Sequence, residues 1–341
     1  MRVLITGGAG FIGSNLAHSL LSEQHQVTLY DNLSRPGGKQ NLTWLRGTFG
    51  DAALLIEADV RDASALVAAA REVDVVVHLA GQVAVTTSVN QPREDFEINA
   101  LGTFNVVEAV RLAPKPPMLL YASTNKVYGG MEGAALVEEA THYRYRDLKG
   151  IPEIQPLDFH SPYGCSKGTG DQYVRDYARI YGLRTVVFRQ SCIYGPRQFG
   201  VEDQGWLAHF IIAAQLGRPI SIYGDGKQVR DMLHVDDLID VYRLAIERID
   251  VAQGEIYNIG GGPANALSIW AEVGPQLERL AGRAIPVTYR EWRPGDQSVC
   301  VMDTSKAERE LGWVPKIGVH KGIESLWDWV SSNRPLFEAS A

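Results

Sequence analysis

Residues 2–13 read Arg-Val-Leu-Ile-Thr-Gly-Gly-Ala-Gly-Phe-Ile-Gly, and this stretch decides the expected fold. An apolar run is followed directly by a GxxGxxG pattern formed by Gly7, Gly10 and Gly13. Where a strand turns into a helix in this way, the N–H groups and the dipole at the helix N-terminus favour an anion such as pyrophosphate. The first glycine permits the tight turn, the second lets the backbone approach the phosphates, and the third lets the helix pack against the strand. The stretch predicts a dinucleotide site, with a plain turn between strand and helix as the alternative.

The bulk composition narrows the class of protein. A chain of 341 residues is long enough for one large domain or two linked ones, and 45% hydrophobic with 21% charged residues is ordinary for a globular protein. The formal net charge of -7 argues against nonspecific nucleic-acid binding. Three cysteines at unrelated spacings indicate no disulfide framework, and no motif has metal-ligand spacing. Without a leader or an apolar run near the ~20 residues of a membrane helix, we expect a cytoplasmic protein.

Short apolar runs alternate with amphipathic stretches over the first 190 residues. We expect helices at 11–22, 63–71, 96–112 and 164–181, and strands at 3–6, 27–30, 54–57, 73–79, 118–122 and 185–188. Near-continuous apolar strands are typical of buried parallel sheets. This alternation predicts an α/β fold with a Rossmann-type doubly wound parallel sheet.

The pattern changes after residue 190, where glycine, proline and tryptophan become more frequent. Short strands are expected at 220–223, 287–289 and 300–302, in a smaller, loop-rich mixed α/β region that covers the carboxyl edge of the sheet. Residues 255–259 could return to the main sheet as a late strand. We therefore predict a dinucleotide-binding domain at 1–190 with a return segment at 229–260, and a substrate-binding domain formed by 191–228 and 261–341.

The type of dinucleotide is indicated by Asp31, which ends the second expected strand 18 residues after Gly13. A carboxylate there can accept hydrogen bonds from ribose hydroxyls and would repel a 2′-phosphate, so NAD is favoured over NADP. The neighbouring Arg35 leaves NADP open. Asp59, Val60, Leu79, Ala80 and Gly81 follow the next strands and are also candidate cofactor contacts, with ordinary turn chemistry at strand ends as the alternative. The remaining candidate cofactor contacts are Phe11, Ile12 and Asn32.

Two further segments carry residues suited to proton chemistry. Tyr163 and Lys167 are four residues apart on an expected helix and so share one face. A nearby ammonium, helped by the charge of an oxidised nicotinamide, would stabilise a phenolate and lower a tyrosine pKa that is normally near 10. Thr124 follows the fifth strand, where its hydroxyl can share a hydrogen bond to substrate with Tyr163. A solvated helix face is the alternative for the tyrosine–lysine pair.

Taken in order, the glycine turn, Asp31, Ser-Thr-Asn-Lys-Val-Tyr-Gly at 123–129 and the tyrosine–lysine pair resemble the extended short-chain dehydrogenase/reductase family, over nearly the whole chain. This family contains nucleotide-sugar epimerases and dehydratases. The resemblance implies that Thr124, Tyr163 and Lys167 are catalytic and that Asn99 is a structural residue linked to the cofactor. It also implies a homodimer or homotetramer paired through helices such as 96–112 and 164–181.

Asn125 and Lys126 bear on the reaction, because the dehydratases of this family carry an Asp-Glu pair there. An amide and a lysine cannot exchange protons as an acid–base pair of carboxyls does, so dehydration is disfavoured. Residues 123–129, 157–167 and 189–205 resemble the members that epimerise a CDP-hexose at C2, of the CDP-paratose to CDP-tyvelose type. That likeness implies transient oxidation at C2 by tightly bound NAD. The implied substrate contacts are Asn125, Lys126, Arg197, Gln198, Gln204, His209, Arg230 and Arg293, the last two holding the diphosphate.

Three other functions stay open at this point. A 4-epimerase of a UDP-sugar would use the same residues with a different sugar pose. A non-catalytic NAD-binding regulator has no need for Thr124, Tyr163 and Lys167. A reductase that releases its cofactor fits less well with Asp31 and the epimerase-like segments.

Overall fold

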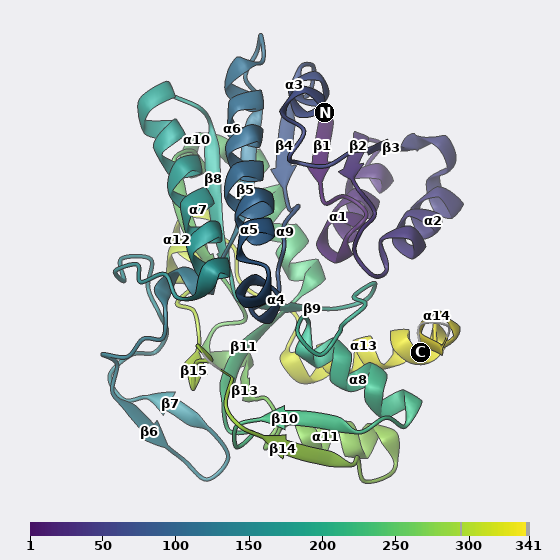
Figure 1. The fold of residues 1–341 in the computed structure, drawn as a ribbon, viewed down its shortest axis with the longest axis vertical. Helices are drawn as coiled ribbons and strands as arrows, with labels where there is room; N and C mark the ends of the chain where they lie inside the picture. The colour runs from purple at the N-terminus through teal and green to yellow at the C-terminus, as the bar shows by residue number, and fades with distance from the viewer. Residues whose placement is uncertain (294, 339–341) are drawn as a thin grey trace.

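The computed structural model describes residues 1–293 and 295–338. Seven parallel strands form the main sheet in the order β12-β8-β5-β4-β1-β2-β3 (Figure 1). The strands are β1 (Arg2–Thr6), β2 (Gln26–Asp31), β3 (Ala53–Glu57), β4 (Val75–His78), β5 (Met118–Thr124), β8 (Thr185–Gln190) and β12 (Glu255–Ile259). The strand order reverses between β1 and β4, which is the switch point where open α/β sheets bind ligands. The predicted Rossmann-type fold is confirmed.

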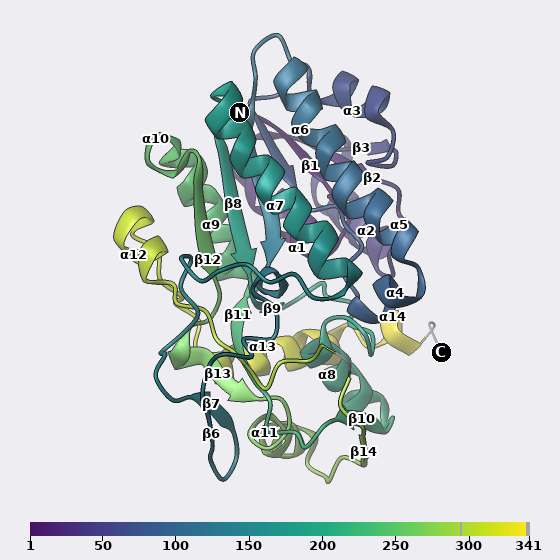
Figure 2. The same cartoon turned by 60° about the vertical axis from the view of Figure 1, so that its left-hand side comes forward.

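Helices cover both faces of this sheet (Figure 2). Alternate residues of β1 divide between the two cores: Val3 and Ile5 pack with one set of helices, and Leu4 packs with the other. The first set comprises α1 (Phe11–Ser22), α2 (Gly38–Phe49) and α9 (Val235–Glu247), and the second comprises α3 (Ala63–Ala70), α6 (Gly102–Leu112) and α7 (Ser161–Tyr181). Both faces of the strands are thus buried, as their continuous apolar character predicts.

The helix expected at 96–112 is interrupted. The structure has α5 (Pro92–Phe96), then a π-helical turn, η2 (Glu97–Leu101), and then α6. Single π-helical turns are frequent at functional sites, and this one contains Asn99. Helix α2 was not among the predicted elements.

The remaining elements form a second core below the carboxyl edge of the sheet. Around β11 (Val229–His234) lie β9 (Cys192–Tyr194), β13 (Ala266–Ser268) and β15 (Val299–Cys300), and β10 (Ile220–Tyr223) pairs with β14 (Val287–Arg290). This region is less loop-rich than predicted, because it contains α8 (Trp206–Leu216), α11 (Val273–Ala281), α13 (Val319–Ser332) and α14 (Pro335–Glu338). Helix α8 is apolar on nearly every side and is largely buried, so it lacks the amphipathic period that marks a surface helix.

The predicted return segment 229–260 divides in two. β11 pairs with β9, β13 and β15 outside the main sheet, whereas α9 packs on α1 and β12 pairs with β8. The chain therefore returns to the sheet only from Val235 onward. The division into two domains stays a prediction, and residues 294 and 339–341 of its second part lie outside the described residues.

Other elements complete the fold: α4 (Val85–Asn90), η1 (Gly50–Ala52), η3 (Asn125–Tyr128), the hairpin β6 (Leu136–Glu138) and β7 (Tyr143–Tyr145), α10 (Ile249–Ala252), η4 (Pro263–Asn265) and α12 (Ser305–Leu311). Within residues 1–293 and 295–338, no helix is both long enough and apolar enough to span a membrane.

Candidate active site

The glycine turn between β1 and α1 has the geometry that a bound diphosphate requires. Gly7 has a φ of +70°, and a Cβ there would lie 2.7 Å from the backbone nitrogen of Ala80. A Cβ on Gly13 would overlap the carbonyl oxygen of Gly7. A Cβ on Gly10 would approach only that same oxygen, at 3.1 Å, so the turn is otherwise open there. The backbone thus leaves room beside the first turn of α1, where helix N–H groups lack carbonyl partners.

Asp31 lies at the carboxyl end of β2 beside this turn. Its Oδ2 accepts a hydrogen bond from the Ala9 N–H at 3.0 Å and its Oδ1 accepts one from the Leu33 N–H at 2.8 Å. Burial raises the pKa of the Asp31 carboxyl, and these backbone donors oppose the shift. Each oxygen keeps a lone pair for a further donor, as two ribose hydroxyls would supply. In the sequence, Arg35 keeps NADP possible as the cofactor. In the structure its guanidinium donates a hydrogen bond to Gln204 Oε1 at 2.9 Å.

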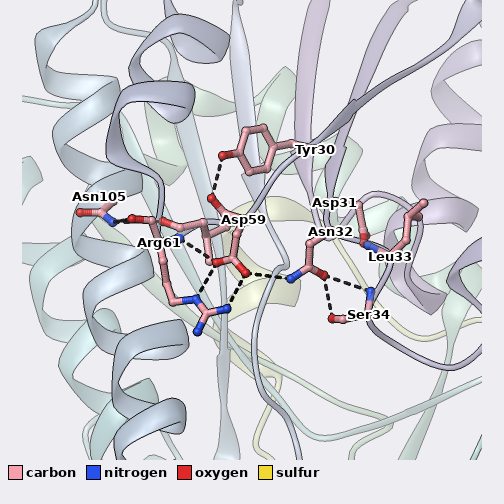
Figure 3. A network of polar contacts seen from close by, with 9 residues as sticks. Tyr30, Asp31, Asn32, Leu33, Ser34, Asp59, Arg61 and Asn105 are labelled. Carbon is pink, nitrogen blue, oxygen red and sulfur yellow. Dashed lines mark hydrogen bonds and ion pairs between the residues drawn. The ribbon is translucent and has the colours of Figure 1, made fainter.

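A polar network links the ends of β2 and β3 (Figure 3). Arg61 donates hydrogen bonds to both carboxylate oxygens of Asp59, at 2.9 and 2.8 Å, and Asn32 Nδ2 donates to the same carboxylate at 2.8 Å. Hydrogen bonds from Arg61 are the main reason that the pKa of Asp59 falls to about 2. Tyr30 donates to the Asp59 carbonyl at 2.8 Å. The network holds this end of the site in one arrangement with an ionised carboxylate.

A cavity of about 440 Å³, called here the first cavity, runs along this edge of the sheet. The predicted cofactor contacts that line it are Gly7, Gly10, Phe11, Ile12, Gly13, Asp31, Asn32, Asp59, Val60, Leu79, Ala80, Gly81, Tyr163 and Lys167. Asn99 lies behind its wall, where its amide exchanges two hydrogen bonds of 2.9 Å with the backbone of Gln82. A Cβ on Gly81 would lie 2.9 Å from Asn99 Oδ1, so only glycine fits between this amide and the cavity.

A second cavity of about 270 Å³ continues from the first. It is lined by Thr124, Asn125 and Lys126 together with residues of β9 and the start of α8. The residues common to both cavities are Phe11, Ile12, Val83, Ser123, Tyr163, Gln190, Gln198 and Gln204. Tyr163 therefore lies at the junction, with Lys167 on the first cavity and Thr124 on the second.

Helix α7 places the tyrosine and the lysine one turn apart. It begins at Ser161-Pro162, and the Ser161 hydroxyl accepts the Gly164 N–H at 3.2 Å, so the tyrosine lies in the first turn. Burial raises the pKa of the Tyr163 phenol, and Thr124 opposes that shift by hydrogen bonding. Burial also lowers the pKa of Lys167 to about 7, against the charges of Asp171 and Asp95. The Lys167 ammonium stacks 4.4 Å from the centre of the Tyr121 ring.

Two buried carboxylates that the sequence did not point to support these side chains. Asp95 accepts hydrogen bonds from Ser166 at 2.6 Å, Gln82 at 2.9 Å and Asn99 at 3.1 Å. Asp95 thus joins α7, the segment 81–82 after β4 and the π-helical turn. The only sequence signal is the position of Asp95, four residues before Asn99.

Asp171 is the second of these buried carboxylates. It accepts hydrogen bonds from Nε and Nη2 of Arg189, each at 2.9 Å. It also accepts a hydrogen bond from Ser123 at 2.7 Å. Arg189 donates in turn to the Tyr128 hydroxyl at 2.9 Å. This fully buried network ties α7 and β8 to the Ser123–Tyr128 segment that carries Thr124.

The predicted substrate contacts are only partly brought together. Asn125, Lys126, Gln198 and Gln204 line the second cavity. Lys126 is held by Gln297 Oε1 at 3.2 Å, and burial lowers its pKa. His209 lines neither of the two cavities.

The three predicted arginines are differently placed. Arg197 lines the first cavity and not the second, and its guanidinium stacks 4.0 Å from the centre of the Trp44 ring. Arg230 is buried and donates to Asp296 at 2.6 Å, whereas Arg293 stacks on Tyr223. Neither of these two lines the first or second cavity, and each has a partner within the chain. In the described parts of the chain, no group of three or more His, Cys, Asp or Glu could hold a metal ion.

Comparisons with known proteins show the family of the chain. The pattern of the NAD dependent epimerase/dehydratase family matches residues 3–260. A CDP-paratose 2-epimerase from Salmonella typhi is 44% identical, over 97% of this chain and 100% of that protein. A putative UDP-glucose 4-epimerase from Methanocaldococcus jannaschii is 32% identical, over 97% and 99%.

Solved structures give the same result. The UDP-glucose 4-epimerase of Thermus thermophilus in complex with NAD superposes with a TM-score of 0.81 at 32% identity, covering 97% of this chain and 99% of the other. A dTDP-glucose 4,6-dehydratase from Streptomyces venezuelae, also with NAD bound, gives a TM-score of 0.86 at 30% identity, covering 99% of both chains. The chain therefore belongs to the NAD-dependent epimerase/dehydratase family, and its cofactor is NAD.

Proposed function

We propose that the protein epimerises a nucleotide-diphosphate sugar at C2, with a CDP-hexose of the paratose type as substrate. The single observation that carries the reaction class is the position of Tyr163 at the junction of the two cavities. The position of the reaction on the sugar, and the base, are supported by the 44% identity to a CDP-paratose 2-epimerase over nearly the full length of both chains.

The residues at the junction have complementary tasks in this proposal. The hydroxyls of Thr124 and Tyr163 hold the C2 hydroxyl of the sugar, and the Tyr163 oxygen takes its proton. NAD⁺ held in the first cavity would supply the acceptor for a hydride from C2, and as NADH it would supply that hydride to the opposite face of the sugar. After the 2-keto sugar has turned, Tyr163 gives the proton back to the new alcohol. The second cavity must therefore let the sugar rotate.

The charges around Tyr163 decide how readily it takes that proton. Burial raises its pKa in the protein, and the negative charge of Asp95 acts in the same direction. The Lys167 ammonium, at the next turn of α7, and the positive ring of the oxidised cofactor both favour a phenolate. Burial lowers the pKa of Lys167 to about 7, and the charges of Asp171 and Asp95 oppose that shift and so favour the charged lysine.

The nucleotide end of the substrate belongs near the segment that follows β14. Arg230 lies close enough to Lys126 and Cys192 to influence the pKa of both, and these two residues line the second cavity. We propose that its guanidinium and that of Arg293 hold the diphosphate, which would require Arg230 to exchange Asp296 for phosphate oxygens. Binding energy would then rest on the nucleotide while the sugar stays mobile.

A UDP-sugar 4-epimerase is the nearest alternative, and it is favoured by the 32% identity to a putative UDP-glucose 4-epimerase. Dehydration is disfavoured because Asn125 and Lys126 line the second cavity in place of an acid–base pair of carboxyls. The lining does include the carboxylate of Asp203, but this group pairs with Arg293 at 3.2 Å.

The proposal is tested with CDP-paratose deuterated at C2, incubated with purified protein in ordinary water. NMR should show the C2 epimer with the label retained, because the hydrogen returns to the carbon that it left. The matched control is the same sugar deuterated at C4. A product epimerised at C4 would replace the proposal by the 4-epimerase alternative, and loss of the C2 label to solvent would refute the oxidation at C2.

A second prediction concerns cofactor choice. Asp31→Asn should weaken NAD binding by about tenfold, since a charged acceptor of ribose hydroxyls is lost, while affinity for the sugar nucleotide changes little. Calorimetry of the cofactor-stripped protein measures the affinities for NAD, for NADP and for the sugar nucleotide in separate titrations. Glu57→Gln, at the exposed end of the neighbouring β3, is the control. Unchanged NAD affinity in Asp31→Asn would contradict the ribose contact.

We further propose a cytoplasmic homo-oligomer. Apolar side chains of α6 and α7, including Phe104, Leu112, Tyr173 and Ile180, are exposed in the single chain. Their position agrees with pairing through these helices, and light scattering would measure the mass. Free thiols at Cys165, Cys192 and Cys300 suit a reducing compartment.

A further inference from the structure

The segment between β9 and α8, residues 196–204, lies along both cavities and is called here the strap. Five of its residues line the first cavity: Arg197, Gln198, Phe199, Val201 and Gln204. Two of these, Gln198 and Gln204, also line the second cavity. The glycine turn of the N-terminal half lines the same cavity. The strap therefore borders the place where a dinucleotide would lie.

Hydrogen bonds fasten the strap to the N-terminal half at three points. Asn15 of α1 donates to the Pro196 carbonyl at 3.0 Å, and Asn41 of α2 donates to the Arg197 carbonyl at 3.3 Å. At the far end, Arg35 donates to Gln204 at 2.9 Å. These contacts join residues that are more than 150 positions apart in the chain.

Arg197 fastens the strap to both halves of the molecule at once. Its guanidinium carbon lies 4.0 Å from the centre of the Trp44 ring in α2 and 5.5 Å from that of Trp329 in α13. His18 stacks on Trp44 at 4.8 Å with nearly parallel rings. A cation between two indoles is attracted by both ring faces. Arg197 also has a φ of +72°, a left-handed conformation that an arginine adopts only when its surroundings hold it there.

The next aromatic residue of the strap fills the gap beside α2. Phe199 packs against Gly37, where a Cβ would overlap its ring. On its other side it contacts Phe337 and Trp329, with ring centres 5.2 and 6.2 Å away. The strap is thus packed between α2 and the C-terminal helices α13 and α14, which lie on the same side of the molecule as α2 in Figure 1.

The strap also carries an unused hydrogen-bond acceptor. Gln198 donates to the Ile193 carbonyl at 3.2 Å, but its Oε1 is buried without a partner among the described residues. A buried acceptor without a donor is unfavourable. Its place beside both cavities is consistent with a donor supplied by a ligand, such as a carboxamide or a sugar hydroxyl.

From these contacts we propose that Arg197 is a positioning residue that closes the strap over bound NAD and sets the rate at which the cofactor leaves. The inference rests on the proposed function only in that NAD occupies the first cavity and is reused at each turnover. The cofactor can leave when the strap lifts, and lifting separates the guanidinium from both indoles. Arg197 acts through the position of the strap, whose Gln198 and Gln204 line both cavities.

The test follows release of NADH from the loaded protein by the decay of its fluorescence after a chase with excess NAD⁺. Arg197→Ala should release NADH about tenfold faster or more, which is the loss expected for two cation–π contacts. Arg197→Lys should lie between Arg197→Ala and the original protein, because it keeps the charge without the planar group. Trp329→Leu should also speed release by removing one indole. Arg111→Ala is the control, since Arg111 stacks on Tyr181 at 5.3 Å and neither residue lines the first or second cavity.

Each result separates this inference from the proposed reaction. Faster release of NADH from Arg197→Ala, with an unchanged rate in Arg111→Ala, supports closure of the strap by Arg197, whatever sugar the protein uses. A lower Tm in Arg197→Ala with an unchanged release rate would show a structural role alone and overturn the inference. A chain that folds but binds no NADH would overturn both the inference and the proposed function.

Discussion

Replacing Tyr163 by phenylalanine should lower kcat by about 10³-fold and leave NAD bound, the largest effect on turnover that we expect from a single atom. The ring of Phe would still fill the junction of the two cavities, where Tyr163 is nearly buried. Only the oxygen that takes the proton would be lost. Since the remaining contacts persist, KM for the sugar nucleotide should change by less than the rate.

Turnover of a CDP-hexose by the variant, with NAD content measured after denaturation, checks this expectation. Tyr145→Phe is a matched control, because Tyr145 is also buried but donates at 2.8 Å to the Val299 carbonyl outside the first and second cavities. It should retain nearly full activity. A Tyr163→Phe variant with normal turnover would remove this residue from the mechanism.

The rate should also depend on pH through the same residue. Burial raises the pKa of Tyr163, so its proton-accepting form becomes more abundant as pH rises. An increase in kcat toward alkaline pH is therefore expected, and the increase should be absent from the residual rate of Tyr163→Phe.

The parts of the site that could be predicted are those encoded by neighbouring residues. The glycine turn, Asp31 at the end of β2 and the tyrosine–lysine pair on α7 depend on local spacing within one strand or helix. Each of them lines the first cavity. The seven-stranded sheet follows in the same way from apolar runs that are buried on both faces.

The contacts that could not be predicted join residues far apart in the chain. The resemblance of residues 189–205 predicts that Arg197 contacts substrate, but its guanidinium stacks on the rings of Trp44 and Trp329. Similarly, Arg230 is paired with Asp296, and no pattern in the sequence indicates this partner. An arginine can satisfy its donors in several ways, and only the packed structure decides which.

The buried pair of Asp171 and Arg189 should be the most sensitive point for stability. Asp171→Ala would leave a guanidinium in the interior with its main partner removed, which costs about 3–5 kcal/mol of unfolding free energy. Both side chains are almost fully buried, at 0% and 2% exposure, so water cannot replace the lost carboxylate. Ser123 would also lose its acceptor, and Thr124 follows it directly. Turnover should therefore fall as well as stability.

Urea unfolding of the single variants Asp171→Ala and Arg189→Met and of the double variant separates the pair from its surroundings. The double variant should be less destabilised than the sum of the two single variants, because removing both charges leaves neither unpaired. Asp240→Ala is the control: it breaks the exposed pair of Asp240 with Lys316, at 2.7 Å, and should cost less than about 1 kcal/mol.

A loss in Asp171→Ala as small as that of the control would mean that Arg189 finds another partner. Tyr128, already 2.9 Å from its guanidinium, and the Glu153 carbonyl are the nearest available acceptors. Neither is charged at neutral pH, so neither can replace a carboxylate that binds both arms of the guanidinium.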